Sequence, residues 1–104
     1  MINTTTSPFI LESGSEQQFD GSSIICHPTY IELQELFSVQ LNIISSTTTS
    51  VIAYGQISVT KTEVDAESGT GTGETAPWFN ALQKAVITKL SAISGNGSVV
   101  FSIV

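Results

Sequence analysis

The sequence predicts a small α+β domain. We expect an antiparallel sheet, made of a long hairpin and a C-terminal strand, packed with one amphipathic helix and preceded by an extended N-terminal arm. Apolar and polar residues alternate through 37–43 and again through 51–64, which is typical of half-buried strands. After Pro77, apolar residues recur at three- and four-residue steps, as on the buried stripe of a helix. The length of 104 residues suits a single domain.

Residues 1–20 are expected to form the arm, and residues 21–104 the single α+β domain. Thr, Ser, Glu and Gln dominate the arm, and they favour neither a helix nor a core. Two apolar groups interrupt this polar run, and we take them as arm anchors. The candidate anchors are Phe9, Ile10, Leu11 and Phe19. Two interpretations stay open, since these side chains either close over the domain's own core or dock on a neighbouring subunit.

The first part of the domain is partly ambiguous. Residues 22–26 form a short β-type run that ends at His27 and Pro28. Thr29 and Glu32 then have capping-box spacing behind a proline, which favours a helical turn. The Thr, Tyr and Ile in the same stretch favour a strand instead. We expect a helical turn that passes into the next strand.

The long hairpin consists of residues 37–43 and 51–64, joined by a Ser/Thr-rich turn. Ile52 and Tyr54 interrupt the polar face of the second strand, so its start is expected to be covered on both faces. Residues 63–75 indicate a flexible acidic loop that contains three glycines.

A helix is expected to begin at Pro77, whose missing N–H costs nothing in the first turn. It is expected to end at Gly95 or Gly97, which accept a positive φ. The apolar stripe of this helix consists of Phe79, Leu82, Val86, Leu90 and Ile93. The alternating apolar residues after it, Val99, Phe101 and Ile103, predict the C-terminal strand.

Four residues in this C-terminal part are candidates for contacts with another chain. Ile87 falls on the polar side of the helix, and Lys89 falls inside the apolar arc. Lys89 either extends its stem along the surface or pairs with a carboxylate across a subunit contact. Phe101 and Ile103 belong to a strand that can pair as an open sheet edge.

The composition excludes several classes of function. The chain has no Arg and only three Lys, whereas 28 residues are Ser or Thr, and the net charge is −6. Nucleic acids and anionic membranes attract Lys/Arg clusters, so neither is an expected partner. A single Cys excludes an internal disulfide. The chain has no secretory signal and no apolar run of about 20 residues, so we expect a protein that is made in the cytoplasm and not secreted.

The sequence offers little catalytic or ligand-binding chemistry. Residues 69–73 are glycine-rich and precede a helix, but position 74 is Glu and no Lys follows, so no phosphate-binding fingerprint is complete. Cys26 and His27 are neighbours on a strand and therefore point to opposite faces. One His and one Cys do not make a zinc site, and the acids of 63–75 match no EF-hand spacing. We expect no enzyme activity, no cofactor and no metal.

These observations favour a non-enzymatic structural or assembly protein. An arm at residues 1–20, followed by a β-rich body in an acidic, Cys-poor chain rich in Ser, Thr and Gly, resembles the small virion proteins of tailed bacteriophages. Those include capsid cement or decoration proteins and small neck or tail components. The resemblance is one of composition across the whole chain.

The resemblance implies a virion protein that stabilises a capsid by bridging neighbouring subunits. Its partners would be the major capsid or other virion subunits and copies of itself. The four arm anchors would hold a neighbouring subunit, so deletion of residues 1–19 would leave the body folded and abolish assembly. One alternative remains open, namely a small acidic binding module or an inhibitor of a host protein. It would use residues 63–75 to bind a basic partner in a salt-sensitive way.

Overall fold

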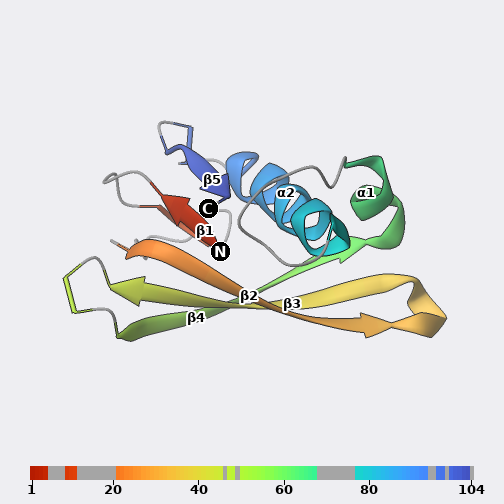
Figure 1. The fold of residues 1–104 in the computed structure, drawn as a ribbon, viewed down its shortest axis with the longest axis horizontal. Helices are drawn as coiled ribbons and strands as arrows, with labels where there is room; N and C mark the ends of the chain where they lie inside the picture. Colours follow the sequence, from red (N-terminus) through yellow and green to blue (C-terminus); the bar gives the residue numbers. More distant parts are fainter. Residues whose placement is uncertain are drawn as a thin grey trace.

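The protein folds into one antiparallel sheet packed with helices, as the sequence predicts. The structure is a computed structural model that describes residues 1–4, 9–11, 21–45, 47–48, 50–67, 77–93, 96–97 and 99–103. Within these ranges five strands pair in the order β4-β3-β2-β1-β5, and every pairing is antiparallel. Both α-helices lie on the same side of the three long strands (Figure 1). The α+β class is confirmed.

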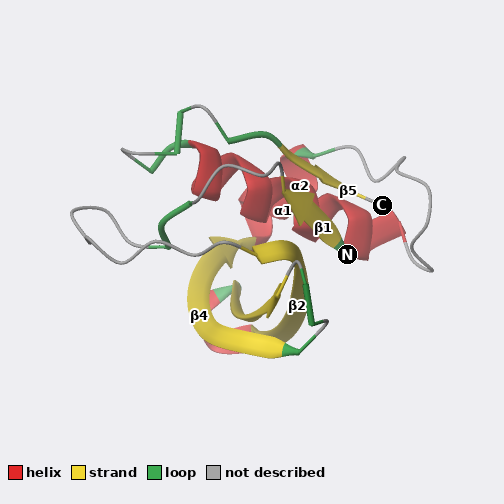
Figure 2. Ribbon diagram, turned by 90° about the vertical axis from the view of Figure 1, so that its left-hand side faces the viewer, coloured by secondary structure: helices red, strands yellow, loops and turns green. Residues whose placement is uncertain are grey.

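The elements follow one another along the chain in a simple order. They are β1 (Ile2–Thr4), β2 (Gly21–Ile31), the short 3-10 helix η1 (Glu32–Gln34), β3 (Leu36–Ser45), β4 (Val51–Thr60), α1 (Lys61–Ala66), α2 (Pro77–Ser91) and β5 (Phe101–Ile103). Seen nearly end-on, the ribbon of β2, β3 and β4 is strongly twisted and curled, with the helices above it (Figure 2).

Strands β3 and β4 form the long hairpin that the alternating pattern predicts. Val39, Leu41 and Ile43 are buried on the helix-facing side of the sheet. The turn closes with the Ser45 N–H donating to the Ser50 carbonyl over 2.9 Å. The hairpin strand is shorter than expected, because β4 ends at Thr60 and the chain turns directly into α1.

Strand β2 is longer than expected and includes the ambiguous residues up to Ile31. The helical turn comes only afterwards, in η1, and the Glu35 N–H donates back to the Glu32 carbonyl over 3.2 Å. Pro28 is tolerated inside the strand because β1 pairs with β2 only at Ser23 and Ile24. At Pro28, β2 therefore pairs only with β3. On the edge of β2 that has no paired strand, a missing N–H removes no hydrogen bond of the sheet.

Helix α1 occupies residues that the sequence assigned to a strand and an acidic loop. Thr60 and Glu63 form a capping box, in which the Glu63 N–H donates to Thr60 Oγ1 and Glu63 Oε1 accepts from the Thr60 N–H. Lys89 Nζ lies 3.0 Å from Glu63 Oε2 and ties α1 to α2. The Thr60 N–H first, and then Lys89, hold the pKa of Glu63 below its ordinary value. The remaining loop residues, 68–76, lie outside the described residues.

Helix α2 carries the predicted apolar stripe, since Leu82, Val86 and Leu90 are fully buried. The expectation that Ile87 lies on the polar, exposed side of the helix is corrected. Because α2 is contacted by α1 and β5 as well as by β4, Ile87 is only partly exposed and packs against the core. Gln83 is also fully buried.

The N-terminal segment is part of the fold, which corrects the division into an arm and a body. Strand β1 lies between β2 and β5, with Ile2 opposite both Ile24 and Ile103. Ile2 is fully buried. A deletion of residues 1–19 would therefore remove an internal strand of the sheet, so we now expect that the body does not fold without them. Phe19, the fourth proposed anchor, lies outside the described residues.

Candidate functional site

The three described arm anchors lie in this chain's own core. Phe9 is fully buried, and its ring meets the ring of Phe101 edge-on with the centroids 5.7 Å apart. Ile10 is also buried. Leu11 occupies the space above Gly55, where a Cβ would lie only 2.5 Å from Leu11 Cδ1. Of the two interpretations left open, closure over the domain's own core therefore describes these residues.

The candidates near the C-terminus are mostly used inside the chain as well. Lys89 pairs with Glu63 of the same chain rather than across a subunit contact. Phe101 is buried and Ile103 is partly buried. Strand β5 does lie at one end of the sheet, so its outer edge faces no described strand, but that edge is only three residues long.

An exposed cluster of aromatic side chains lies elsewhere, where Tyr30, Phe37 and Trp78 form a row that we call the aromatic patch. Tyr30 and Phe37 are cross-strand partners in β2 and β3, with ring centroids 4.8 Å apart. The rings of Phe37 and Trp78 are nearly parallel, at 18°, with centroids 6.2 Å apart. Both spacings lie within the range of favourable aromatic pairs. Nevertheless, Tyr30 is 42% and Trp78 52% exposed.

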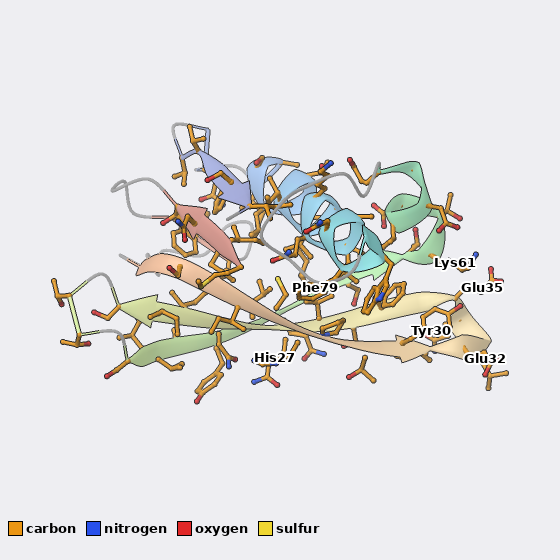
Figure 3. All side chains as sticks on the ribbon, in the orientation of Figure 1. His27, Tyr30, Glu32, Glu35, Lys61 and Phe79 are labelled. Carbon is orange, nitrogen blue, oxygen red and sulfur yellow. The ribbon has the colours of Figure 1, made fainter. Side chains whose placement is uncertain are left out.

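The aromatic patch is exposed because β2 and β3 extend beyond the part of the sheet that the helices cover. Tyr30 lies four residues after buried Cys26, and Phe37 two residues before buried Val39. Even spacings place side chains on one face of a strand, so the patch continues the core face toward the β2–β3 turn. Figure 3 shows Tyr30 near this end of the ribbon. The apolar face of β2 and β3 therefore becomes exposed to solvent where it extends beyond the helices.

Helix α1 provides a second wall beside the aromatic patch. An open hollow of about 420 Å³ is lined by Tyr30, Phe37, Lys61, Val64, Asp65 and Trp78. Lys61 Nζ lies 3.1 Å from Asp65 Oδ2, so these two charges are already paired at the rim. A mostly apolar hollow with a few polar groups at its edge is the usual form of a binding site.

The β2–β3 turn adds an apolar tip and two acids to the same end of the molecule. Leu33 is 99% exposed at this tip. Glu32 and Glu35 flank it, and Figure 3 labels both at the same end of the ribbon as Tyr30 and Lys61. Glu35 has φ 48°, the left-handed conformation that costs a residue with a Cβ about 1–2 kcal/mol. Such positions are concentrated at functional sites.

The sheet has a second open surface, on the face turned away from the helices. A hollow of about 490 Å³ there is lined mainly by polar residues of β2, β3 and β4, among them His27, Gln40 and Gln56. Ile52 is 50% and Tyr54 67% exposed on this face. The expectation that the start of β4 is covered on both faces is wrong, because no element of the described chain packs there.

Cys26 and His27 point to opposite faces of β2, as expected from their adjacency. Cys26 is 4% exposed in the core, whereas His27 is exposed on the open face. Burial raises the pKa of the Cys26 thiol to about 12 from its ordinary value of 9.0. The thiol is therefore protonated at neutral pH, and His27 is not placed to act as its base.

Among the described residues, no three His, Cys, Asp or Glu side chains are grouped closely enough to hold a metal ion. Neither helix in the described part of the chain has the length and apolar character needed to cross a bilayer.

The fold and the site together define a class, a small antiparallel α+β domain that presents an exposed aromatic patch. Comparison of the chain with protein-family models, with curated proteins and with solved structures gives no match.

The sequence does not predict the aromatic patch as a site, although part of the signal is present. Tyr30 and Phe37 flank a short turn, so a hairpin between β2 and β3 places them opposite each other. Recognising this requires residues 29–31 to be assigned as strand. Trp78 joins the row only through the docking of α2 on the sheet, which no local pattern reveals.

Proposed function

We propose that this chain is a non-enzymatic structural protein that binds other protein subunits through the aromatic patch and the adjoining Leu33. The observation that carries the proposal is the combined exposure of Leu33, at 99%, and Trp78, at 52%, at one end of the molecule. Soluble domains seldom leave clustered large apolar side chains uncovered, and such clusters mark interaction sites. Aromatic residues are also the ones that most often dominate binding energy at interfaces.

We further propose that the assembly is a virus particle, with the chain as a cement or decoration protein of a capsid or as a neck or tail component. The support is the composition, rich in Ser, Thr and Gly, acidic and poor in Cys, which resembles small virion proteins of tailed bacteriophages. In this proposal the folded body makes the contact, because Phe9, Ile10 and Leu11 are used inside the domain.

The alternative of a soluble inhibitor that acts through residues 63–75 has less support. Glu63 is paired with Lys89, and Asp65 with Lys61. Two of the acids that such a module would offer to a basic partner are thus already neutralised within the chain. A structural role at the aromatic patch does not need these carboxylates.

Protein composition of purified particles tests this function. Particles are purified from cells in which the genome encoding this chain replicates, and the number of copies per major shell subunit is measured by mass spectrometry. We expect a fixed ratio that survives repeated purification. A chain that stays in the soluble fraction, with no particle-bound copies, would overturn the proposal and favour a soluble binding module.

A further inference from the structure

The aromatic patch lies beside a surplus of negative charge. Glu32 and Glu35 flank the β2–β3 turn next to Tyr30 (Figure 3), and neither is in an ion pair within the described part of the chain. The nearest cation, Lys61, is paired with Asp65 over 3.1 Å. The surface around the rings thus combines flat apolar faces with unpaired carboxylates.

The chain itself has little positive charge to offer this surface. It contains no Arg, and its three Lys are Lys61, Lys84 and Lys89. Lys61 and Lys89 are each in an ion pair with an acid on α1. The segments outside the described ranges contain no Lys or Arg in their sequence. No segment of the chain that lies outside the described residues therefore supplies a complementary side-chain cation.

A second copy of the chain is a poor occupant as well. In a two-fold contact the same surface meets itself, so Glu32 and Glu35 would face the same carboxylates of the other copy. Like charges brought together across an interface cost free energy. The complementary surface therefore belongs to a different protein, one that presents a cation beside apolar side chains.

We propose that the aromatic patch binds an arginine-bearing segment of a partner protein. The guanidinium stacks on the exposed ring of Tyr30 and its N–H groups donate to the carboxylate of Glu35, while apolar side chains beside the arginine pack on Trp78. Arginine fits better than lysine because its planar group both stacks on aromatic faces and forms a fork with a carboxylate. Tyr30, Phe37 and Trp78 contact one another in a row rather than enclosing a gap, so they form a platform and not a cage for a compact ammonium group.

This inference rests on the proposed function, since it takes the aromatic patch as a protein interface. The chain provides a direct reporter, because Trp78 is its only tryptophan. Three matched probes are used: acetyl-Leu-Arg-Leu-amide and the same peptide with lysine or with citrulline, the uncharged analogue of arginine. Each is titrated into the purified full chain while Trp78 emission is followed.

We expect a saturable change in Trp78 emission with a dissociation constant on the order of millimolar for the arginine peptide. The lysine peptide binds more weakly, and the citrulline peptide about tenfold more weakly than the arginine peptide. Added salt weakens the binding of the arginine peptide and leaves the binding of the citrulline peptide nearly unchanged. Glu35→Gln raises the dissociation constant of the arginine peptide by about fivefold. The matched control Glu67→Gln, which removes an acid at the end of α1, leaves it unchanged.

Three outcomes would overturn the proposal. One is equal binding of the arginine and citrulline peptides, and another is the lack of any saturable response to the arginine peptide. The third is a Trp78 emission that shifts with the concentration of the chain alone, which would assign the patch to a second copy. The titration uses the isolated chain, so it can fail while particles still contain the protein, and it can succeed if they do not.

Discussion

The side-chain amide of Asn96 forms hydrogen bonds with both the backbone N–H and the backbone carbonyl of Ile10. Asn96 Oδ1 accepts from the Ile10 N–H, and Asn96 Nδ2 donates to the Ile10 carbonyl, each over 2.9 Å. The same Nδ2 also donates to the Leu90 carbonyl, where α2 comes to its end, over 2.9 Å. Asn96 is 1% exposed. One buried amide thus joins the N-terminal segment, the end of α2 and the segment that leads to β5.

Replacement of Asn96 with Ala is expected to destabilise the fold by about 2–4 kcal/mol. The substitution leaves the buried N–H and carbonyl of Ile10 without their partner, whereas the Leu90 carbonyl still accepts from the Ile93 N–H. Each unsatisfied group costs about 1–3 kcal/mol, with partial relaxation. The measurement is the free energy of unfolding from urea titration. Asn42→Ala is the control, because Asn42 Oδ1 only accepts from Gln40 Nε2 on the exposed face. Equal effects of the two substitutions would contradict the role assigned to Asn96.

Removal of residues 1–11 is expected to prevent cooperative folding. The truncation deletes β1, which joins β2 to β5, and also removes Phe9 and the backbone that Asn96 binds. Loss of a fully buried Phe side chain alone costs about 3–5 kcal/mol, which is comparable to the whole stability of a small domain. Circular dichroism during a thermal scan tests this. A truncated chain with a sharp unfolding transition would restore the view of this segment as a separate arm.

Gln83→Leu is expected to stabilise the protein by about 1–3 kcal/mol. Gln83 is fully buried, and neither Oε1 nor Nε2 of its amide has a hydrogen-bond partner among the residues that the structure describes. A leucine has a similar volume and carries no polar group that needs a partner. The unfolding midpoint in urea should rise. A lower midpoint would mean that the amide is satisfied in solution, by bound water for example.

Stability is expected to fall above about pH 9 because of Cys26. The thiol ionises near its ordinary value of 9.0 in the unfolded chain, but burial raises its pKa to about 12 in the fold. The stability that the buried, protonated thiol contributes is therefore fully present below pH 9 and is lost as the pH rises toward 12. The free energy of unfolding falls by up to about 1.4 kcal/mol per pH unit. The difference in unfolding free energy between the wild type and Cys26→Ala isolates this effect from other titrations. A difference that stays constant from pH 8 to 11 would be evidence against it.

Glu35→Gly is expected to raise the stability by about 0.5–1 kcal/mol. Glycine relieves the cost of φ 48°, partly offset by the greater freedom of glycine in the unfolded chain. Glu35→Ala removes the same carboxylate but keeps the Cβ, so it should not be stabilising. If both variants raise the unfolding free energy equally, the cause is the loss of charge and not the relief of backbone strain. The glycine variant should also bind the arginine peptide more weakly, because it lacks the carboxylate that accepts from the guanidinium.

The sequence predicts the elements whose patterns are local. The alternation in β3 and β4 and the stripe of Leu82, Val86 and Leu90 depend on one buried face per element, and these predictions are confirmed. The capping box at Thr60 and Glu63 was also readable, but the continuing alternation up to Val64 pointed to a strand.

What the sequence could not reveal depends on contacts between distant segments. Strand β1 is only three residues long and gains its place through pairing with β2 and β5. Phe9 and Ile10 look like anchors for a neighbour until the fold brings Phe101 and Asn96 against them. The aromatic patch likewise depends on Trp78 meeting the β2–β3 hairpin.

In the proposed assembly, the exposed end of the molecule, and not an arm, binds the partner. The most direct test is the number of copies per particle for Leu33→Ser and for Gln34→Ser, its exposed neighbour in η1. Both substitutions are uncharged and should change the unfolding free energy by less than about 0.5 kcal/mol. We predict that Gln34→Ser is incorporated like the wild type, whereas Leu33→Ser remains folded and is lost from the particles. Equal incorporation of the two variants would contradict the account.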